Sequence, residues 1–461
     1  MRMLMVLFSV LLAGALLGIT PSGAQVPPIS HPNIVVLMTD DMRYDQMRFL
    51  PETTKLFPGL RYTQAFYVQT LCCPSRTTFL TGMYPHNHRI QDNDRDPGAD
   101  QIFRDGPYDD RALPVALDHA GYRTALIGKY LNGYGGDYVP PGWDRWFAHT
   151  GGDSGVWKPT YYGSTEGHVT SSTIDAETLA GKSEDFLSSS NPSPFFLLTT
   201  FHSPHPPVQM APQYSDIYGG EGLPRTPEWN EEDVTDKPQW VQNLPPISAD
   251  RARTLDATWR QRARALRSVD DAIARIHAKL RDTGHLDDTY VFVLSDNGVS
   301  LGEHRRVGKT GAYDADARMP LLISGPGLPT ADRNALVGMH DLSPTILDLT
   351  GVPPLLEPDG ISFRPTFSGQ GIRKRLLIEN ASRLGSAPVY NAIRSRTRLF
   401  TDYYEIGQRE LYYVDKDKDP HMLENSWQQA PSSLRTELYN RLQHLSSCRA
   451  STCHSAEGAT G

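Results

Sequence analysis

Short apolar runs rich in β-branched residues recur along the chain and alternate with helical patterns. The runs are too short for buried helices, and they predict buried strands at Asn33–Met38, Arg123–Ile127, Phe195–Thr199, Tyr290–Leu294 and Pro320–Ile323. Amphipathic patterns predict helices at Leu113–His119, at about Arg251–Arg281 and at Ser343–Leu349. Strands that alternate with helices favour an α/β fold with a mostly parallel sheet.

Polar side chains follow four of these predicted strands at the point where each strand ends. They are Asp40-Asp41, Lys129, His205 and Asp296-Asn297, in the order of the strands along the chain. Ligands of open α/β sheets bind beyond the carboxyl ends of the strands. We therefore expect these side chains to converge on one candidate active site.

The acidic members of this set suggest a metal ion. Asp40, Asp41, Asp296 and Asn297 offer hard oxygen ligands, which suit Ca²⁺ or Mg²⁺ better than zinc. Taken alone, the first pair also suits a turn or a helix N-cap, and the second pair also suits a turn. Because both pairs follow buried strands, we favour metal binding.

Size and charge narrow the classes of function. A chain of 461 residues can bury a large core, and its net charge is −8 with an isoelectric point of about 6.0. Neither value indicates a nucleic-acid footprint, so we expect no nucleic-acid partner.

The first 24 residues are typical of a cleaved export signal. Arg2 precedes the apolar run Leu4–Leu17, and Ser22-Gly23-Ala24 offers a small-residue cleavage site. The alternative is a membrane anchor, for which the apolar run is short. No later segment is apolar enough to cross a bilayer, and we expect a secreted or periplasmic protein without stable membrane insertion.

Four cysteines occur, and their spacing separates them into two pairs. In an exported protein, Cys448 and Cys453 could close a small disulfide loop. A disulfide between the adjacent Cys72 and Cys73 would be strained. Those two thiols are left without structural partners, which is unusual outside the cell unless one of them is used chemically.

The C-terminal part predicts a small α+β subdomain. Residues 206–250 are interpreted as a long surface excursion and residues 352–375 as a linker rich in proline and glycine. Strands are then expected at Val389–Arg394, Arg398–Tyr404 and Glu410–Val414, with a turn at Ile406-Gly407-Gln408, and a helix at Ser432–His444. We divide the chain into a signal at 1–24, a catalytic domain at 32–365 and a subdomain at 375–461.

The run from Cys72 to Gly82 resembles the signature of the type I sulfatases, C-x-P-S-R-x-x-x-L-T-G. In that family the first cysteine is oxidised to formylglycine, whose hydrate attacks sulfur. The resemblance implies that Cys72 is the precursor of the nucleophile. Ser75–Leu80 is expected to open a helix whose N-terminal N–H groups face the sulfate.

The resemblance extends to the acidic pairs. Pro32–Asp41 and Val293–Gly298 are similar to the two metal-binding stretches of the family, where the metal is usually calcium and also holds an oxygen of the nucleophile. It implies a calcium site made by Asp40, Asp41, Asp296, Asn297 and residue 72, with Mg²⁺ as the alternative ion.

Other residues match the positions that handle sulfate in this family. Arg76 resembles the arginine that supports the hydrate, and Lys129 and Lys309 resemble the sulfate-binding lysines. His205 matches the histidine that protonates the leaving alcohol, with His202 as the alternative.

Two segments point to one branch of the family. Lys129-Tyr130-Leu131-Asn132 and Tyr84–His88 resemble the glucosamine-6-sulfatases and the extracellular endosulfatases. Leu131 stands where many relatives have a histidine, so the base that breaks down the intermediate is left unassigned. Tyr84–His88 is expected either to contact the sugar or to serve a structural role, and His304 either to line the site or to be structural.

The resemblance implies an alkaline-phosphatase-like sandwich with a large mixed sheet and a small C-terminal domain. The implied reaction is hydrolysis of a sugar or aryl sulfate ester through a covalent sulfo-enzyme intermediate, after maturation by a formylglycine-generating enzyme. One alternative is a phosphodiesterase or phosphonate monoester hydrolase of the same superfamily. The other is a non-catalytic protein that binds sulfated glycans.

Overall fold

The computed structural model describes residues 31–93, 98–150, 160–164, 169–171, 175–385 and 387–459. The predicted export signal lies outside these residues. Within them, no helix combines the length and the apolar character needed to cross a membrane.

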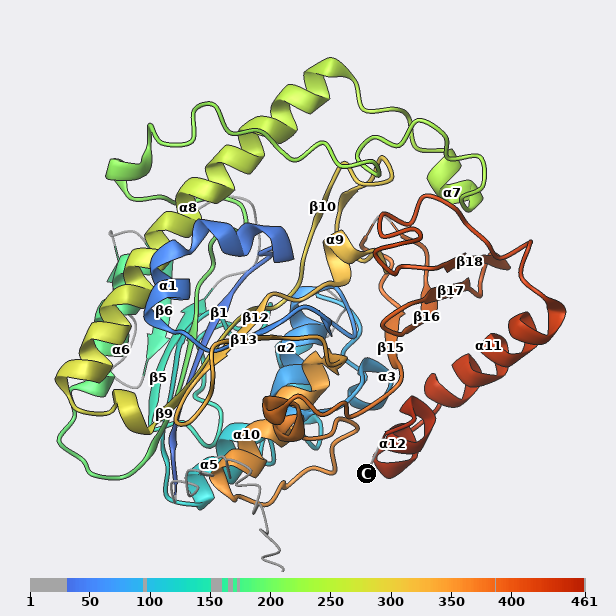
Figure 1. The fold of residues 1–461 in the computed structure, drawn as a ribbon. Coiled ribbons are helices and arrows are strands. Elements are labelled where there is room, and N and C mark those ends of the chain that lie inside the picture. The colour runs from blue at the N-terminus through green and yellow to red at the C-terminus, as the bar shows by residue number, and fades with distance from the viewer. Residues whose placement is uncertain are drawn as a thin grey trace, which may run out of the picture.

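A ten-stranded mixed sheet forms the centre of the molecule (Figure 1). Its strands run in the order β13-β2-β12-β9-β1-β8-β4-β5-β6-β7. Their bounds along the chain are β1 Asn33–Thr39, β2 Leu60–Tyr62, β4 Arg123–Gly128, β5 Arg145–Thr150, β6 Thr160–Ser164, β7 Val169–Ser171, β8 Phe195–Thr200, β9 Thr289–Ser295, β12 Leu321–Ser324 and β13 Ala331–Arg333. All five predicted strands are present, and the α/β fold class is confirmed.

The central strands are parallel, and strand direction changes toward both edges. β9, β1, β8, β4 and β5 are parallel neighbours, whereas β12 pairs antiparallel with β9 and β6 pairs antiparallel with β5. The sheet is therefore mixed but mostly parallel at its centre, as expected.

Helices cover both faces of the sheet, which explains why the strands are apolar without alternation. Val35 and Leu37 of β1 join the hydrophobic cluster with α1 (Pro51–Leu56), α6 (Asp175–Leu187) and α8 (Ala249–Asp282). Ile34 and Val36 join the cluster on the opposite face with α2 (Cys72–Thr81), α5 (Leu113–His119) and α10 (Leu342–Thr350).

The predicted helices agree with the structure at their ends. α5 has the predicted bounds, and α8 begins after the N-cap Ser248, whose Oγ accepts a hydrogen bond from the Arg251 N–H at 3.2 Å. α10 ends at Gly351, which has a φ of +71° and so favours glycine.

Short elements complete the domain. They are β3 Ala65–Phe66, α3 Pro85–His88, α4 Ala99–Asp105, α7 Gln239–Gln242, β10 Ser300–Leu301, β11 Val307–Gly308, α9 Asp314–Ala317 and β14 Val337–Gly338, together with the 3-10 helices η1 Tyr44–Phe49, η2 Pro212–Tyr214, η3 Leu286–Asp288, η4 Met339–Asp341 and η5 Arg364–Ser368. Residues 206–250, predicted as an excursion, contain the short helices η2 and α7, and α8 begins at the end of this range, at Ala249.

The C-terminal part is a four-stranded antiparallel sheet with two helices, coloured orange to red in Figure 1. Its elements are β15 Leu376–Asn380, β16 Tyr390–Arg394, β17 Leu399–Tyr403, β18 Gln408–Tyr412, α11 Ser432–Leu445 and α12 Ser451–Glu457. The disulfide between Cys448 and Cys453, which links the ends of α11 and α12, is confirmed.

Three details of this part differ from the prediction. β15 was not predicted as a strand, and α12 was not predicted as a helix. β18 begins and ends two residues before the predicted Glu410–Val414, because the turn at Gly407, with a φ of +66°, places Gln408 directly opposite Tyr403 in the ladder.

The segment Tyr84–His88 has a structural role at the contact between the two parts. The imidazole Nδ1 of His86 lies 3.0 Å from both carboxylate oxygens of Glu379 in β15, and its Nε2 lies 2.9 Å from the carbonyl oxygen of Cys448. His88 is fully buried against Thr78. Neither histidine belongs to the polar cluster at the sheet edge.

We predict that the His86–Glu379 pair makes stability depend on pH. Burial lowers the pKa of His86, but the charge of Glu379, its hydrogen bonds and Asp359 raise this pKa from 6.5 to about 9. A raised folded-state pKa stabilises the protein fully below the unfolded value of 6.5, and this contribution is lost as the pH rises through about 9. The neighbouring His88 has a pKa lowered to about 3 and stays neutral over this range.

The measurement is urea unfolding between pH 6 and 9.5 at fixed calcium concentration. The free energy of unfolding of the His86→Gln variant should fall below that of the wild type by on the order of 2 kcal/mol at low pH, with the difference closing at high pH. The exposed His119→Gln serves as the control. A difference that is constant over this range would contradict the assignment.

Candidate active site

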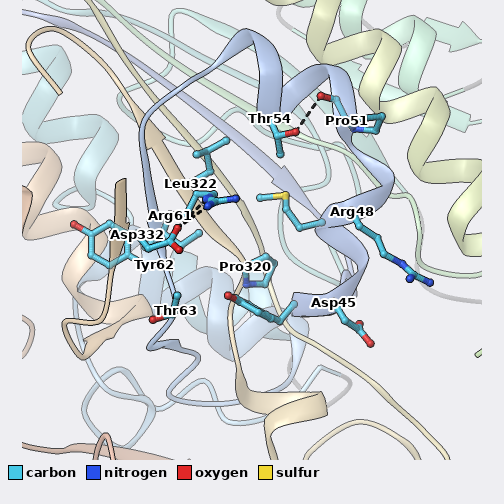
Figure 2. A pocket seen from close by; sticks show the side chains of 13 residues that line it. Asp45, Arg48, Pro51, Thr54, Arg61, Tyr62, Thr63, Pro320, Leu322 and Asp332 are labelled. Carbon is cyan, nitrogen blue, oxygen red and sulfur yellow. Dashed lines mark hydrogen bonds and ion pairs between the residues drawn. The ribbon is translucent and has the colours of Figure 1, made fainter. Parts of the chain in front are cut away.

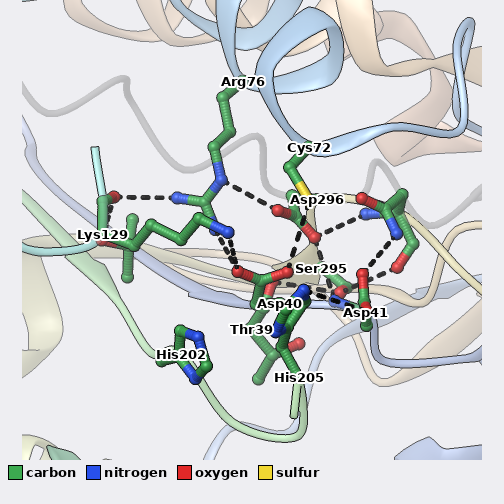
Figure 3. A network of polar contacts seen from close by, with 12 residues as sticks. Thr39, Asp40, Asp41, Cys72, Arg76, Lys129, His202, His205, Ser295 and Asp296 are labelled. Carbon is green, nitrogen blue, oxygen red and sulfur yellow. Dashed lines mark hydrogen bonds and ion pairs between the residues drawn. The ribbon is translucent and has the colours of Figure 1, made fainter. Parts of the chain in front are cut away.

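The polar residues predicted from separate strands form one buried network (Figure 3). Asp40 and Asp41 follow β1, Lys129 follows β4, His205 follows β8, and Asp296 and Asn297 follow β9. Cys72 and Arg76 enter from α2, and Lys309 follows β11. Register explains the meeting of the acidic groups, because Thr39 pairs with Ser295 and the next residue on each strand is an aspartate.

Cys72 lies at the start of α2, three residues earlier than the predicted helix start. Leu71 before it is extended, and Pro74 occupies the first turn, where its missing N–H is not needed. The Cys72 side chain is fully buried. Its Sγ lies 3.7 Å from Asp40 Oδ1 and accepts a hydrogen bond from Lys309 Nζ at 3.1 Å. The positive end of the helix therefore faces the network.

Asp40 is the most strongly compensated carboxylate. Lys129 Nζ donates to its Oδ2 at 2.6 Å, and Arg76 Nη2 lies 3.5 Å from the same oxygen. Burial would raise the pKa of Asp40, but the cationic groups of Lys129, His205, Arg76 and Lys309 hold that pKa well below its usual range. Asp40 is therefore ionised.

Asp41 connects the acidic pair to the opposite side of the network. Its Oδ1 lies 2.6 Å from Lys309 Nζ and accepts a hydrogen bond from Asn297 Nδ2 at 2.6 Å. Its backbone has a φ of +67°, in the left-handed region that costs a non-glycine residue about 1 kcal/mol or more. Contacts of the surrounding loops must hold Asp41 in this conformation.

Asp296 is held by Arg76 and by the backbone. Arg76 Nε donates to Asp296 Oδ2 at 2.8 Å, while Oδ1 accepts the N–H groups of Asp41 at 3.0 Å and of Asn297 at 2.8 Å. Burial and the charge of Asp40 raise the pKa of Asp296, against the effect of Arg76. Arg76 also donates to the carbonyl oxygen of Lys129 at 2.8 Å, which links α2 to the end of β4.

Two histidines approach the network from the loop after β8. His205 Nε2 lies 3.8 Å from Asp41 Oδ2, and His205 Nδ1 faces the carbonyl oxygen of Pro206. His202 stacks edge-on against His205 with ring centroids 4.9 Å apart, and burial lowers the pKa of His202 well below its usual range. His205 therefore lies within 3.8 Å of the acidic pair, and His202 lies beside it as a neutral ring (Figure 3).

The donor set fits a hard cation. Ligand atoms of Asp40, Asp41, Cys72 and His205 lie within 4.8 Å of one another. Asn297 Oδ1 is buried and has no hydrogen-bond partner among the described residues, although its Nδ2 is fully used. A buried amide oxygen without a donor is costly, and a cation beside Asp41 would satisfy it.

The thiol of Cys72 is unsuited to act as a thiolate. Burial raises its pKa well above the ordinary value, and the opposing effect of Lys129 and Lys309 does not overcome this. A reactive cysteine normally has a lowered pKa. The raised pKa of Cys72 therefore favours the protonated thiol.

Some residues of the site were not predicted. Ser295 Oγ donates to the carbonyl oxygen of Thr39 at 3.0 Å and accepts from the Met42 N–H at 2.9 Å, which fixes the two strand ends. Arg262 of α8 donates a hydrogen bond to the carbonyl oxygen of Asp41. The sequence holds only a weak signal for Arg262, which is its position within the apolar stripe of a helix that carries many other arginines.

His304 is structural. It is buried, its Nδ1 lies 2.6 Å from Glu231 Oε2, and burial lowers its pKa to about 3. It contacts the excursion 206–250 instead of the polar network.

A pocket of about 470 Å³ lies apart from this network (Figure 2). It opens between η1, α1 and the strands β2 and β12. Its two arginines are already paired, Arg48 with Glu221 and Arg61 with Asp332. Because neither arginine among the described residues that line this pocket is free to bind a ligand, the network around Cys72 is the candidate active site.

Comparison with known proteins agrees with this geometry. The sulfatase family model matches residues 32–352, and the model of the C-terminal region of N-sulphoglucosamine sulphohydrolase matches residues 302–448. An N-acetylglucosamine-6-sulfatase of Capra hircus is 30% identical, over 92% of this chain and 85% of the relative. An extracellular sulfatase of Drosophila melanogaster is 32% identical over 80% of this chain, which spans only 35% of that relative.

Solved structures share the fold. A protein in complex with its substrate D-glucosamine-2-N,6-O-disulfate has a TM-score of 0.78 at 22% identity, covering 90% of this chain and 97% of that chain. A phosphonate monoester hydrolase of Agrobacterium radiobacter has a TM-score of 0.70 at 22% identity, covering 90% and 95%.

We predict that removal of the Arg76 guanidinium destabilises the protein strongly. Arg76→Met would leave Asp296 buried without its cation, and breaking a buried ion pair in this way costs about 3–5 kcal/mol. Urea unfolding in metal-free buffer measures the loss. The matched control is Arg61→Met, whose exposed pair with Asp332 should contribute less than about 1 kcal/mol. Equal losses for the two variants would contradict this account of the network.

Proposed function

This chain belongs to the sulfatase family, and from that premise we propose that it hydrolyses sulfate esters at the start of α2. The observation that carries the proposal is the set of cations around Cys72. Lys309 Nζ lies 3.1 Å from its Sγ, and Lys129 and Arg76 lie on the other side of Asp40. Such a fixed arrangement of positive charge suits a small tetrahedral anion.

The nucleophile in this proposal is formylglycine made from Cys72. The motif Cys72–Gly82 supports it, as does the buried, protonated thiol. A hydrated aldehyde supplies two hydroxyl groups where the thiol supplied one poor nucleophile. A formylglycine-generating enzyme is the partner required for maturation.

The reaction then follows in two steps. One hydroxyl of residue 72 loses its proton to solvent and bonds to sulfur, the bond between sulfur and the alcohol oxygen breaks, and the alcohol leaves with a proton from His205. The second hydroxyl loses its proton, the bond between the residue 72 carbon and the sulfated oxygen breaks, and sulfate leaves as the aldehyde re-forms. Water restores the hydrate.

The remaining side chains position the sulfate group and stabilise the hydrate of residue 72. Lys129 and Lys309 hold sulfate oxygens, and Arg76 fixes Asp296 and supports the hydrate. The group that removes the proton in the second step is left unassigned, because Leu131 occupies the position where many relatives have a histidine.

A calcium ion, with magnesium as the alternative, is proposed at the acidic edge of this site. Asp40, Asp41, Asp296 and Asn297 would hold it, together with an oxygen of residue 72. When bound, the ion supplies positive charge that favours an ionised oxygen on residue 72. The free Asn297 Oδ1 supports this placement.

The proposed substrate is a sulfated amino sugar, most simply N-acetylglucosamine 6-sulfate. The N-acetylglucosamine-6-sulfatase relative supports this choice, and so does the fold neighbour that binds a 6-O-sulfated glucosamine. The second candidate, hydrolysis of a phosphonate monoester or a phosphodiester, is favoured by the likeness to a phosphonate monoester hydrolase. A non-catalytic glycan-binding role is the third outcome that the experiment separates.

We also propose secretion or periplasmic export with cleavage near residue 24, because relatives include extracellular sulfatases. The division into a catalytic domain at 32–365 and a subdomain at 375–461 remains our proposal.

The experiment that tests the proposed function compares substrates and two cysteine variants. Protein co-expressed with a formylglycine-generating enzyme should hydrolyse N-acetylglucosamine 6-sulfate faster than phenylphosphonate esters or phosphodiesters. Cys72→Ala should lower turnover by at least about 10³-fold. Cys73→Ala, the adjacent matched control, should retain it. A preference for phosphorus esters would favour the second candidate, and binding without turnover would favour the third.

Calcium binding provides an independent prediction. Asn297→Ala removes an amide oxygen from the proposed site, and we expect calcium affinity to fall by at least about tenfold, measured by isothermal titration calorimetry. Asn243→Ala, an exposed asparagine at the end of α7, is the control. Unchanged affinity in Asn297→Ala would exclude the proposed ligand set.

A further inference from the structure

The long helix α8 carries a single buried arginine within its apolar stripe. Leu255, Trp259, Leu266 and Val269 face the core at helical spacing, and Arg262 occupies the position between them where an apolar residue is expected. Arg262 is only 2% exposed. Every other arginine of α8 is partly or fully exposed.

The hydrogen bonds of Arg262 all go to neutral acceptors. Its Nη2 donates to the carbonyl oxygen of Asp41 and, at 2.9 Å, to Gln46 Oε1, and its Nη1 donates to the carbonyl oxygen of Pro204 at 3.2 Å. No carboxylate among the described residues forms an ion pair with it. A buried cation without a carboxylate partner costs stability, so stability alone does not explain an arginine here.

Gln46 lies in η1, and the two carbonyl acceptors belong to the two loops that carry functional side chains. Asp41 lies in the loop after β1, where its left-handed backbone needs support, and Pro204 directly precedes His205 in the loop after β8. The side chains of these loops meet at 3.8 Å between Asp41 Oδ2 and His205 Nε2. One guanidinium thus contacts both loops.

We propose that Arg262 is a positioning residue that holds Asp41 and His205 in a fixed relation to residue 72. This proposal rests on the proposed function of the site. The two terminal nitrogens of a planar guanidinium can donate to two carbonyl groups at once. A lysine at the same position offers one ammonium on a flexible stem and would hold the two loops less firmly.

The experiment uses the full chain with Arg262→Met, Arg262→Lys and the matched control Arg264→Met. Arg264 also donates to a backbone carbonyl, that of Ile217, but this lies in the surface excursion away from the site. Arg262→Met should weaken calcium binding by at least about tenfold. It should lower kcat on N-acetylglucosamine 6-sulfate by about 10²-fold. KM should change by less than about threefold, because the sulfate-binding lysines are intact.

The other two variants serve as the conservative change and the control. Arg262→Lys should recover part of the lost calcium affinity and part of the lost kcat, and Arg264→Met should match the wild type in both. If Arg262→Met does not fold, the calcium affinity and the kcat of Arg262→Lys test the proposal. Wild-type values of both quantities in Arg262→Lys would then overturn it.

Hydrogen exchange separates this proposal from the proposed function. In metal-free protein, the amides of residues 40–46 and of His202, Ser203 and His205 should exchange faster in Arg262→Met than in the wild type, and Arg264→Met should leave them unchanged. If the wild type neither binds calcium nor hydrolyses sulfate esters, the proposed function fails. Hydrogen exchange still tests the positioning role of Arg262 in that case. Unchanged exchange in both segments would overturn the role of Arg262.

Discussion

Burial of three carboxylates at the ends of two adjacent strands is the constraint on which the rest of the site depends. Asp40, Asp41 and Asp296 meet at the edge of an apolar sheet, where like charges repel strongly unless cations are brought to them. The fold meets this need from several directions. α2 supplies Arg76, the end of β4 supplies Lys129, and the β10–β11 hairpin supplies Lys309. The same cations then surround residue 72.

The register of the sheet determines this arrangement of carboxylates. Because β1 and β9 are parallel and pair Thr39 with Ser295, the aspartates that follow must emerge side by side. A slip of one residue would turn one of them to the opposite face. The helices on both faces keep the strands dry, so the polar groups can leave the core only at the strand ends. The candidate active site lies at these strand ends, where Asp40, Asp41 and Asp296 follow the apolar strands.

Much of this could be predicted because the chain marks it locally. The five predicted strands are mainly apolar runs, and Asp40, Lys129 and Asp296 each follow the end of one within two residues. Less regular segments were missed. β5 mixes arginine and histidine with its apolar residues, and β15 carries Glu379 for a partner on α3. Arg262 was hidden among the many arginines of α8, since its importance depends on loops more than fifty residues away. Contacts of this kind are properties of the fold and leave little trace in local pattern.

The central claim is that residue 72 acts as an oxidised side chain. The most direct measurement is mass spectrometry of the peptide that contains Cys72, in preparations made with graded amounts of a formylglycine-generating enzyme, alongside turnover of a sulfate ester. The account predicts that specific activity rises in proportion to the fraction of peptide carrying the aldehyde. Full turnover by protein in which that peptide retains its thiol would contradict it.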